Sequence, residues 1–166
     1  RLTSNVKPAK STMRKEDVAA SLSELAFDFF YWFSRFEFAL KENRYLKSHV
    51  PGTNAEPGWD EFVSRWQGQY SLSAEARLLL ESPPERQVVL ADDKLCWKAV
   101  GLGDCKSDLA KIVRLVKTVR NNLFHGGKYA EADWDDPQRT QGLLEGSLTL
   151  LRQFAELASI EADFTQ

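Results

Sequence analysis

The sequence predicts an all-α fold, a helical bundle with two pairs of long core helices, and three observations carry that prediction. Apolar residues recur at steps of three and four over three long stretches, which is the spacing of one helix face. Proline lies between these stretches or in a first turn, where it does not interrupt a helix. Strand-like alternation is confined to one short region, and the sequence contains no internal repeat.

The first of these helices is expected at residues 16–47. Eight of the twelve residues from Phe27 to Phe38 are aromatic, and one stripe cannot hold them all. The helix is therefore either the centre of the bundle, or its second face meets another subunit. The side chains that lie off the main stripe are Phe27, Phe30, Tyr31 and Phe38.

The middle of the chain is divided into short pieces. Residues 49–58 are rich in Pro and Gly and are expected to form a loop. Short helices are expected at 60–69 and 74–81, the second capped by Ser73. Residues 87–99 remain open between a small hairpin and a partly ordered loop across the bundle.

Two more long helices complete the bundle. One is capped by Asp104 or Ser107 and ends at the two glycines 126–127. The last opens with Asp136 as its cap and a proline in the first turn, and continues to about residue 161.

Composition and charge restrict the function. Of the 166 residues, 43% are hydrophobic and 28% are charged, which fits one globular domain at 13–166 and excludes wholesale disorder. Residues 1–12 are polar, and we expect a vector-derived or disordered tail there, with Met13 as the native start. The net charge is −2, and −5 without the three basic residues of that tail. Any RNA contact must therefore be focal.

Two cysteines, Cys96 and Cys105, form no CxxC motif, and the two histidines and scattered carboxylates form no cluster with metal-ligand spacing. No metal ion or cofactor is therefore expected. Reduced thiols favour a cytoplasmic protein. No apolar run approaches the roughly 18 residues of a membrane span, so no membrane partner is expected.

The segment RNNLFHGGK, residues 120–128, is the candidate site. Asn121 and His125 are four residues apart and share one helix face, where the amide can fix the imidazole tautomer. Asn121 and Asn122 are poor interior helix formers, and a local inconsistency of this kind tends to mark function. A structural alternative is a protonated His125 that satisfies the carbonyls at the helix end.

The spacing also occurs a second time, from Arg44 to His49. That copy has no Asn after the Arg and no Gly-Gly behind the His. We interpret it as a coincidence at a helix end.

RNNLFHG near the end of a long helix in a small helical protein resembles the HEPN superfamily, whose mark is Arg-x(4–6)-His. The aromatic first helix with Ser34-Arg35-Phe36-Glu37 is similar to the plasmid- and phage-borne members. The resemblance implies an HEPN-like bundle and a metal-independent endoribonuclease, often a dimeric toxin or phage-defence effector with an antitoxin partner. In one toxin branch a Tyr follows two residues after the His, where this chain has Gly127.

The chemistry of RNA cleavage assigns roles to these residues. His125 is expected to be the general acid or base, Arg120 the phosphate clamp and Asn121 the orienting residue. Cleavage through the 2′-hydroxyl would leave a 2′,3′-cyclic phosphate and a 5′-hydroxyl. The candidates for additional substrate binding are Lys128, Asn122, Arg35 and Glu37.

Two other functions remain open. The same cleft could bind a nucleotide or an acidic antitoxin segment without turnover, or the protein could be a purely structural helical dimer. A homodimer is expected because the surplus aromatic side chains suggest an interface and because a two-fold axis would double every site residue.

Overall fold

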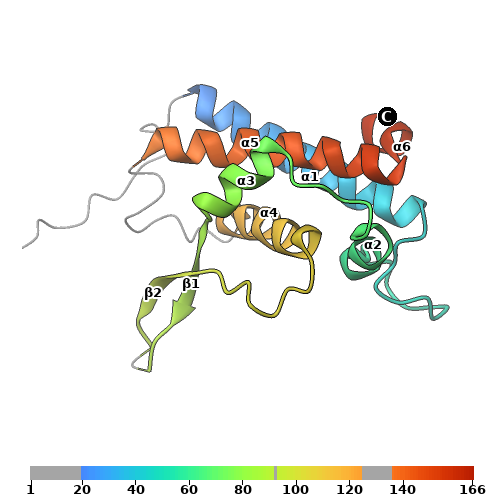
Figure 1. Ribbon diagram of the computed structural model, residues 1–166, viewed down its shortest axis with the longest axis horizontal. Helices are drawn as coiled ribbons and strands as arrows, with labels where there is room; N and C mark the ends of the chain where they lie inside the picture. Colours follow the sequence, from blue (N-terminus) through green and yellow to red (C-terminus); the bar gives the residue numbers. More distant parts are fainter. Residues whose placement is uncertain (1–19, 92, 125–135) are drawn as a thin grey trace, which may run out of the picture.

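The computed structural model describes residues 20–91, 93–124 and 136–166 (Figure 1). The described residues are mostly helical, as predicted, with one small two-stranded sheet. They contain three long helices, where two pairs were expected. None of their helices is long and apolar enough to cross a membrane. The tail at 1–12 and the glycines at 126–127 lie outside the described ranges. The elements are α1 (Ala20–Glu42), α2 (Trp59–Trp66), α3 (Ala74–Glu81), β1 (Glu85–Val89), β2 (Leu95–Ala99), α4 (Asp108–Phe124), α5 (Pro137–Ala158) and α6 (Glu161–Thr165).

The core forms where α1 and α5 run side by side, with α4 packed beneath them in the view of Figure 1. Phe36 of α1 is fully buried at its centre. Its ring centroid lies 5.6 Å from that of Phe62, 6.0 Å from Phe154 and 6.1 Å from Phe164. One aromatic side chain of α1 therefore joins α2, α5 and α6 into a single apolar cluster.

The aromatic residues of α1 divide between core and surface. The predicted stripe is buried at Leu22, Phe29, Phe33, Phe36 and Leu40. The four off-stripe side chains are exposed at 65% for Phe27, 39% for Phe30, 43% for Tyr31 and 38% for Phe38. Among the described residues, this second face of α1 is therefore only partly covered.

Helix α1 ends at Glu42, five residues before the predicted end. Arg44 adopts the left-handed conformation, with φ at 66°, and its N–H donates to Lys41 O at 3.0 Å. Tyr45 N–H donates to Leu40 O at 2.9 Å, which completes a Schellman cap. The prediction of a helix to residue 47 was wrong because this cap uses an arginine where glycine is the usual signal.

Side-chain caps agree with the sequence at three helices. Ser73 Oγ accepts a hydrogen bond from Ala76 N, and Ser107 Oγ accepts one from Ala110 N, both at 3.2 Å. Asp136 Oδ1 accepts one from Arg139 N at 3.0 Å. Ser107, rather than Asp104, is the cap of α4.

The C-terminal helix is two helices. Ser159 is left-handed, with φ at 56°, and ends α5 at Ala158. The chain then turns into α6, whose Phe164 packs 5.1 Å from the Trp32 ring of α1. The predicted single helix to about residue 161 was therefore too long, and α6 was missed.

The segment predicted at 87–99 is a hairpin, and the loop alternative is wrong. The two strands pair antiparallel from Glu85↔Ala99 to Val89↔Leu95. The hairpin projects from the helical body (Figure 1). Asn122 of α4 ties its base to the bundle, because Asn122 Nδ2 donates to Glu85 O at 2.7 Å.

Candidate functional site

The residues predicted to form the site fall partly inside the described ranges. His125 and Lys128 lie outside them, so the roles assigned to these two residues stay predictions. The structure places the remaining five, which are Arg35, Glu37, Arg120, Asn121 and Asn122.

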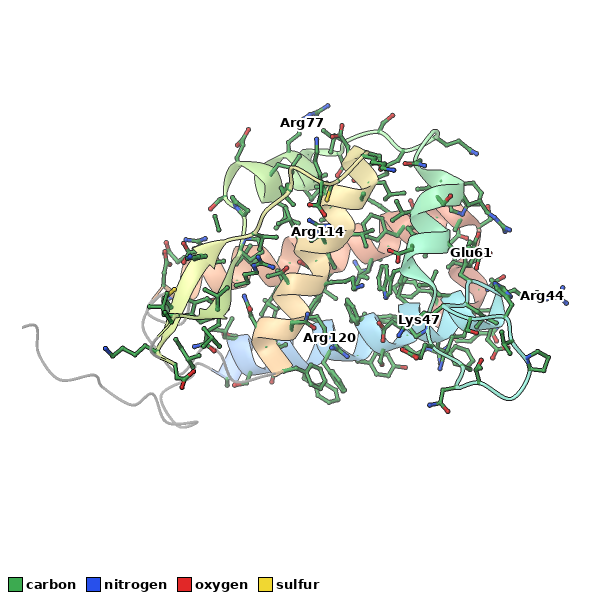
Figure 2. The ribbon with its side chains drawn as sticks, turned by 90° about the horizontal axis from the view of Figure 1, so that it is seen from below. Arg44, Lys47, Glu61, Arg77, Arg114 and Arg120 are labelled. Atoms are coloured by element: carbon green, nitrogen blue, oxygen red, sulfur yellow. The ribbon has the colours of Figure 1, made fainter. Side chains whose placement is uncertain are left out.

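Arg120 lies near the C-terminal end of α4 (Figure 2), and its guanidinium contacts two aromatic rings. Its guanidinium carbon is 4.7 Å from the ring centroid of Phe124 and 5.5 Å from that of Phe33. Among the described residues it has no ion-pair partner, and its buried Nε has no hydrogen-bond partner. The two rings orient the guanidinium without neutralising it. An oriented, uncompensated guanidinium is well suited to bind a phosphate or carboxylate.

Asn121 supports this arginine. Arg120 Nη1 donates to Asn121 Oδ1 at 3.0 Å, and the Asn121 side chain is exposed. In the described part of the chain, Asn121 therefore orients Arg120. Its predicted contact with His125 stays a prediction, because His125 lies outside the described ranges.

Asn122 is used differently from its neighbour. It is buried, and its amide holds the first residue of β1 at Glu85 O. Asn122 therefore attaches the hairpin to α4, which explains a polar residue at this interior helix position. The sequence did not indicate this structural role.

Arg35 and Glu37 lie two residues apart on α1, about 200° around the helix, and the structure separates them. Arg35 lies 4.5 Å from the Phe38 ring and donates from Nη2 to Asp163 O at 2.6 Å, on the side of α6. Glu37 lines the same pocket as Arg120. The geometry therefore groups Glu37 with the motif and assigns Arg35 to the packing of α6.

That pocket, here called the Arg120 pocket, has a volume of about 590 Å³ between α1, the loop before α2, and α4. Glu37 Oε1 accepts a hydrogen bond from Trp59 Nε1 at 2.9 Å, which fixes the carboxylate in the wall. Lys117 also lines it, with Nζ 5.8 Å from the Trp59 ring centroid. Sequence reasoning missed Lys117, although its position one turn before Arg120 was a usable signal.

Of the three other carboxylates that line the pocket, Glu56 and Glu61 are engaged by neighbours, whereas Asp60 has no ion-pair partner among the described residues. Glu56 pairs with Lys47 at 2.8 Å. Glu61 accepts hydrogen bonds from Leu46 N and from His49 Nε2, both at 3.1 Å. The His49 hydrogen bond is the main reason that the pKa of Glu61 is lowered. Glu56 and Glu61 therefore do not neutralise Arg120.

One wall of the pocket depends on a glycine. Gly58 packs against the backbone of Leu46, and a Cβ on Gly58 would lie 2.6 Å from Leu46 N and C. Its N–H donates to Tyr45 O at 2.8 Å. The loop before α2 is held close to the end of α1 by this contact, which any larger residue would disrupt.

The second Arg-x(4)-His copy has a different environment. Arg44 forms the left-handed cap of α1, and His49 lies beyond the helix in the loop that contacts Glu61. The two side chains share no helix face. This arrangement agrees with the interpretation that the second copy is a coincidence at a helix end.

Within the described ranges, no three His, Cys, Asp or Glu side chains gather where they could hold a metal ion. The candidate site is thus a mixed pocket with an unpaired arginine, a nearby lysine and one carboxylate oriented by an indole. Comparison of the chain with protein-family models, with curated proteins and with solved structures finds no match.

Proposed function

We propose that the protein is a metal-independent endoribonuclease of the HEPN type, acting as a toxin or phage-defence effector. The observation that carries the proposal is Arg120, which has no ion-pair partner among the described residues and contacts two aromatic rings in a pocket that also holds Glu37 and Lys117. The motif places His125 five residues after this arginine, on the same segment.

In this proposal Arg120 binds the scissile phosphate. Its planar fork offers two parallel N–H groups to the phosphate oxygens, and the aromatic rings prevent it from turning away. Negative charge on those oxygens grows as the phosphorane forms. A donor placed in advance stabilises that charge most strongly where water is excluded, and Arg120 is partly buried.

Glu37 is proposed to receive the ribose. Trp59 occupies Oε1 of Glu37, and no described residue donates to Oε2. A free carboxylate oxygen accepts a hydrogen bond from the 2′-hydroxyl of the nucleotide next to the reacting one, a group that RNA has and DNA lacks, and the reacting 2′-hydroxyl is left to His125. The pocket would thereby distinguish the two nucleic acids while Lys117 adds positive charge beside the phosphate.

The proton transfers are assigned to His125. An imidazole nitrogen takes the proton of the 2′-hydroxyl, the 2′-oxygen forms a bond to phosphorus, and the bond from phosphorus to the 5′-oxygen breaks. A proton is delivered to that leaving oxygen by the acid form of histidine. The products are a 2′,3′-cyclic phosphate and a 5′-hydroxyl, so no water or metal is consumed in this step.

A homodimer is part of the proposal. The exposed aromatic residues of α1 continue onto α4, because the Phe124 ring lies 4.8 Å from that of Phe30 and is 47% exposed. A second copy on this aromatic surface would cover it and bring two motif segments to one cleft. Light scattering should give twice the chain mass, and Phe30→Glu should shift it toward one chain mass.

The second candidate is a non-catalytic module that binds a nucleotide or an acidic segment of an antitoxin. The mixed charge of the pocket and the net charge of −2 favour this function more than they favour a broad-specificity nuclease. Binding without turnover by the wild-type protein would select it.

The test is incubation of the protein with total tRNA and with synthetic RNA in EDTA. Wild-type protein should cleave, and His125→Ala should not. The chain offers a matched control, because His49→Gln alters the second Arg-x(4)-His copy, keeps a hydrogen-bond donor for Glu61 and should cleave like the wild type. Mass spectrometry of the fragments should find the cyclic phosphate.

Cleavage that EDTA abolishes would contradict the metal-independent mechanism. Equal cleavage by His125→Ala would mean that a contaminant or another site is responsible.

A further inference from the structure

Three pockets meet along α4. The Arg120 pocket shares Asp60 and Lys117 with a pocket of about 680 Å³ between α2 and α4. That pocket in turn shares Arg114, Thr118 and Asn121 with one of about 450 Å³ beside the hairpin. Because neighbouring pockets share lining residues, the three adjoin one another along α4, and together they are here called the α4 groove.

The floor of the groove is one face of a helix. Ala110, Arg114, Thr118 and Asn121 recur at steps of three and four. From the start of α4 to Asn121 the helix rises about 20 Å. The groove is therefore long enough for several nucleotides of an extended strand, whereas the Arg120 pocket occupies only one part of it.

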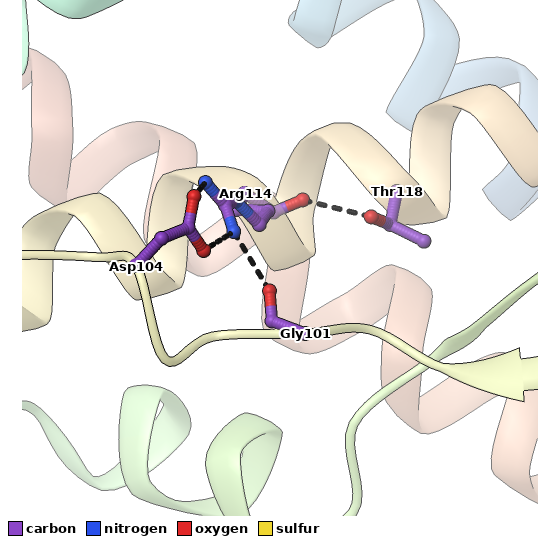
Figure 3. A network of polar contacts seen from close by, with 4 residues as sticks. All are labelled: Gly101, Asp104, Arg114 and Thr118. Atoms are coloured by element: carbon purple, nitrogen blue, oxygen red, sulfur yellow. Dashed lines mark hydrogen bonds and ion pairs between the residues drawn. The ribbon is translucent and has the colours of Figure 1, made fainter.

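The charges of the groove are predominantly positive once internal pairs are removed. Arg114 is neutralised by both carboxylate oxygens of Asp104 and also donates to Gly101 O at 2.7 Å (Figure 3). Within the described ranges, three further cations of the groove besides Arg120 have no ion-pair partner, and two lining carboxylates, Glu37 and Asp60, have none either. Those cations are Arg86, Lys106 and Lys117.

Neutral hydrogen-bonding groups line the groove together with these cations. They are Ser64 of α2, Gln67 directly after α2, and Gln87 of β1. Their hydroxyl and amide groups both donate and accept, as do the edges of unpaired bases and the 2′-hydroxyl. Isolated cations together with such groups suit a strand that carries one charge per nucleotide. A densely acidic peptide would meet fewer complementary groups.

We infer that the α4 groove binds single-stranded RNA, with Lys117 at the junction between the Arg120 pocket and the rest of the strand. Arg86 and Lys106 bind phosphates farther from the cleavage point. This inference rests on the proposed ribonuclease function and adds the path of the substrate. The three cations are binding residues, since the reacting atoms lie at the Arg120 pocket.

The test uses fluorescence anisotropy with 2′-O-methyl RNA oligomers, which lack the nucleophile and cannot be cleaved. Oligomers from a dinucleotide upward are titrated against wild-type protein and the single variants Arg86→Gln, Lys106→Gln and Lys117→Gln. The matched control is Arg77→Gln on α3, which removes the same charge at an exposed position that lines none of the three pockets (Figure 2). Circular dichroism melts check that each variant is folded.

Each lost phosphate contact should weaken binding of long oligomers about fivefold at about 0.1 M salt, because the salt slope for single strands is roughly 0.7 per contact. Arg86→Gln and Lys106→Gln should leave dinucleotide binding unchanged. Lys117→Gln should weaken the binding of both lengths. Arg77→Gln should bind every length as the wild type does.

Two results would overturn the inference and leave the proposed function standing. In one, the groove variants bind long RNA like Arg77→Gln while the wild type still cleaves. In the other, oligoglutamate displaces the RNA at a lower concentration than unlabelled RNA of equal charge, which would assign the groove to an acidic protein segment. A wild-type protein that binds no RNA of any length would overturn both the inference and the proposed function.

Discussion

Arg114 and Arg120 lie on the same helix, and their surroundings are opposite. Arg114 is closed into a network with Asp104 and Gly101, and its side chain attaches the loop before α4 to the helix (Figure 3). Arg120 is partly buried between Phe33 and Phe124 and meets no carboxylate in the described ranges.

The difference shows how a structural arginine is distinguished from a candidate binding residue. The Arg114 hydrogen bonds hold the pKa of Asp104 down to about 2, so both charges of that pair are already satisfied. A guanidinium oriented by aromatic faces retains its full charge for a ligand. What distinguishes the two arginines is therefore the group that each side chain contacts, more than how deeply each is buried.

The largest expected effect is on catalysis. Arg120→Gln should lower the rate of RNA cleavage by about 10²–10³-fold, the usual loss for a preorganised group that stabilises transition-state charge. Its melting temperature should change little. Arg114→Gln should cleave at nearly the wild-type rate, measured in the same EDTA assay. An equal loss of cleavage rate in Arg120→Gln and Arg114→Gln would contradict the distinction between a binding arginine and a structural one.

A smaller effect is expected from the aromatic clamp. Phe124→Leu keeps the site apolar but removes one ring from Arg120, so cleavage should fall roughly two- to fivefold, equivalent to a surface cation–π contact. Arg120→Lys in the same assay serves as a reference, since lysine keeps the charge but loses the planar fork. Light scattering of Phe124→Leu accompanies the cleavage assay, because Phe124 is also part of the proposed dimer surface. A slower cleavage rate counts as a loss of the cation–π contact only when the oligomeric state is unchanged.

Thermal stability should depend on Arg114 more than on Arg120, which is the reverse of the expected effect on cleavage. Arg114→Gln and Asp104→Asn should each lower the melting temperature by a few degrees at most, because the pair is partly exposed to solvent. The double variant should lose no more than either single variant, since both remove the same interaction. Thermal melts followed by circular dichroism measure the two single variants and the double variant. Arg120→Gln is the control, and its melting temperature should stay close to that of the wild type.

The smallest expected effect is a pH dependence. The pKa of Asp104 falls from 3.8 to about 2 on folding, so its contribution is present above pH 4 and is lost as pH falls toward 2. The stability difference between wild type and Asp104→Asn should therefore shrink over that range, as measured by urea unfolding. A difference that stayed constant down to pH 2 would mean that Asp104 is not ionically paired in solution.

Local sequence was sufficient for the described helices other than α6, and for the caps of three of them. Ser73, Ser107 and Asp136 act as caps within their own first turns, so no distant contact was needed to recognise them. The C-terminal ends at Arg44 and Ser159 were missed, because each adopts a left-handed conformation that the rest of the fold stabilises.

The candidate site divides in the same way. The segment from Arg120 to Asn122 was recognisable from its spacing and its poor helix propensity, which are properties of adjacent residues. Tertiary structure decided that Glu37 joins Arg120, that Arg35 turns to α6, and that Lys117 lines the shared pocket. The physical reason is that a charged group acquires its role from its partners, and partners such as Trp59 are brought together by packing of helices distant in the sequence.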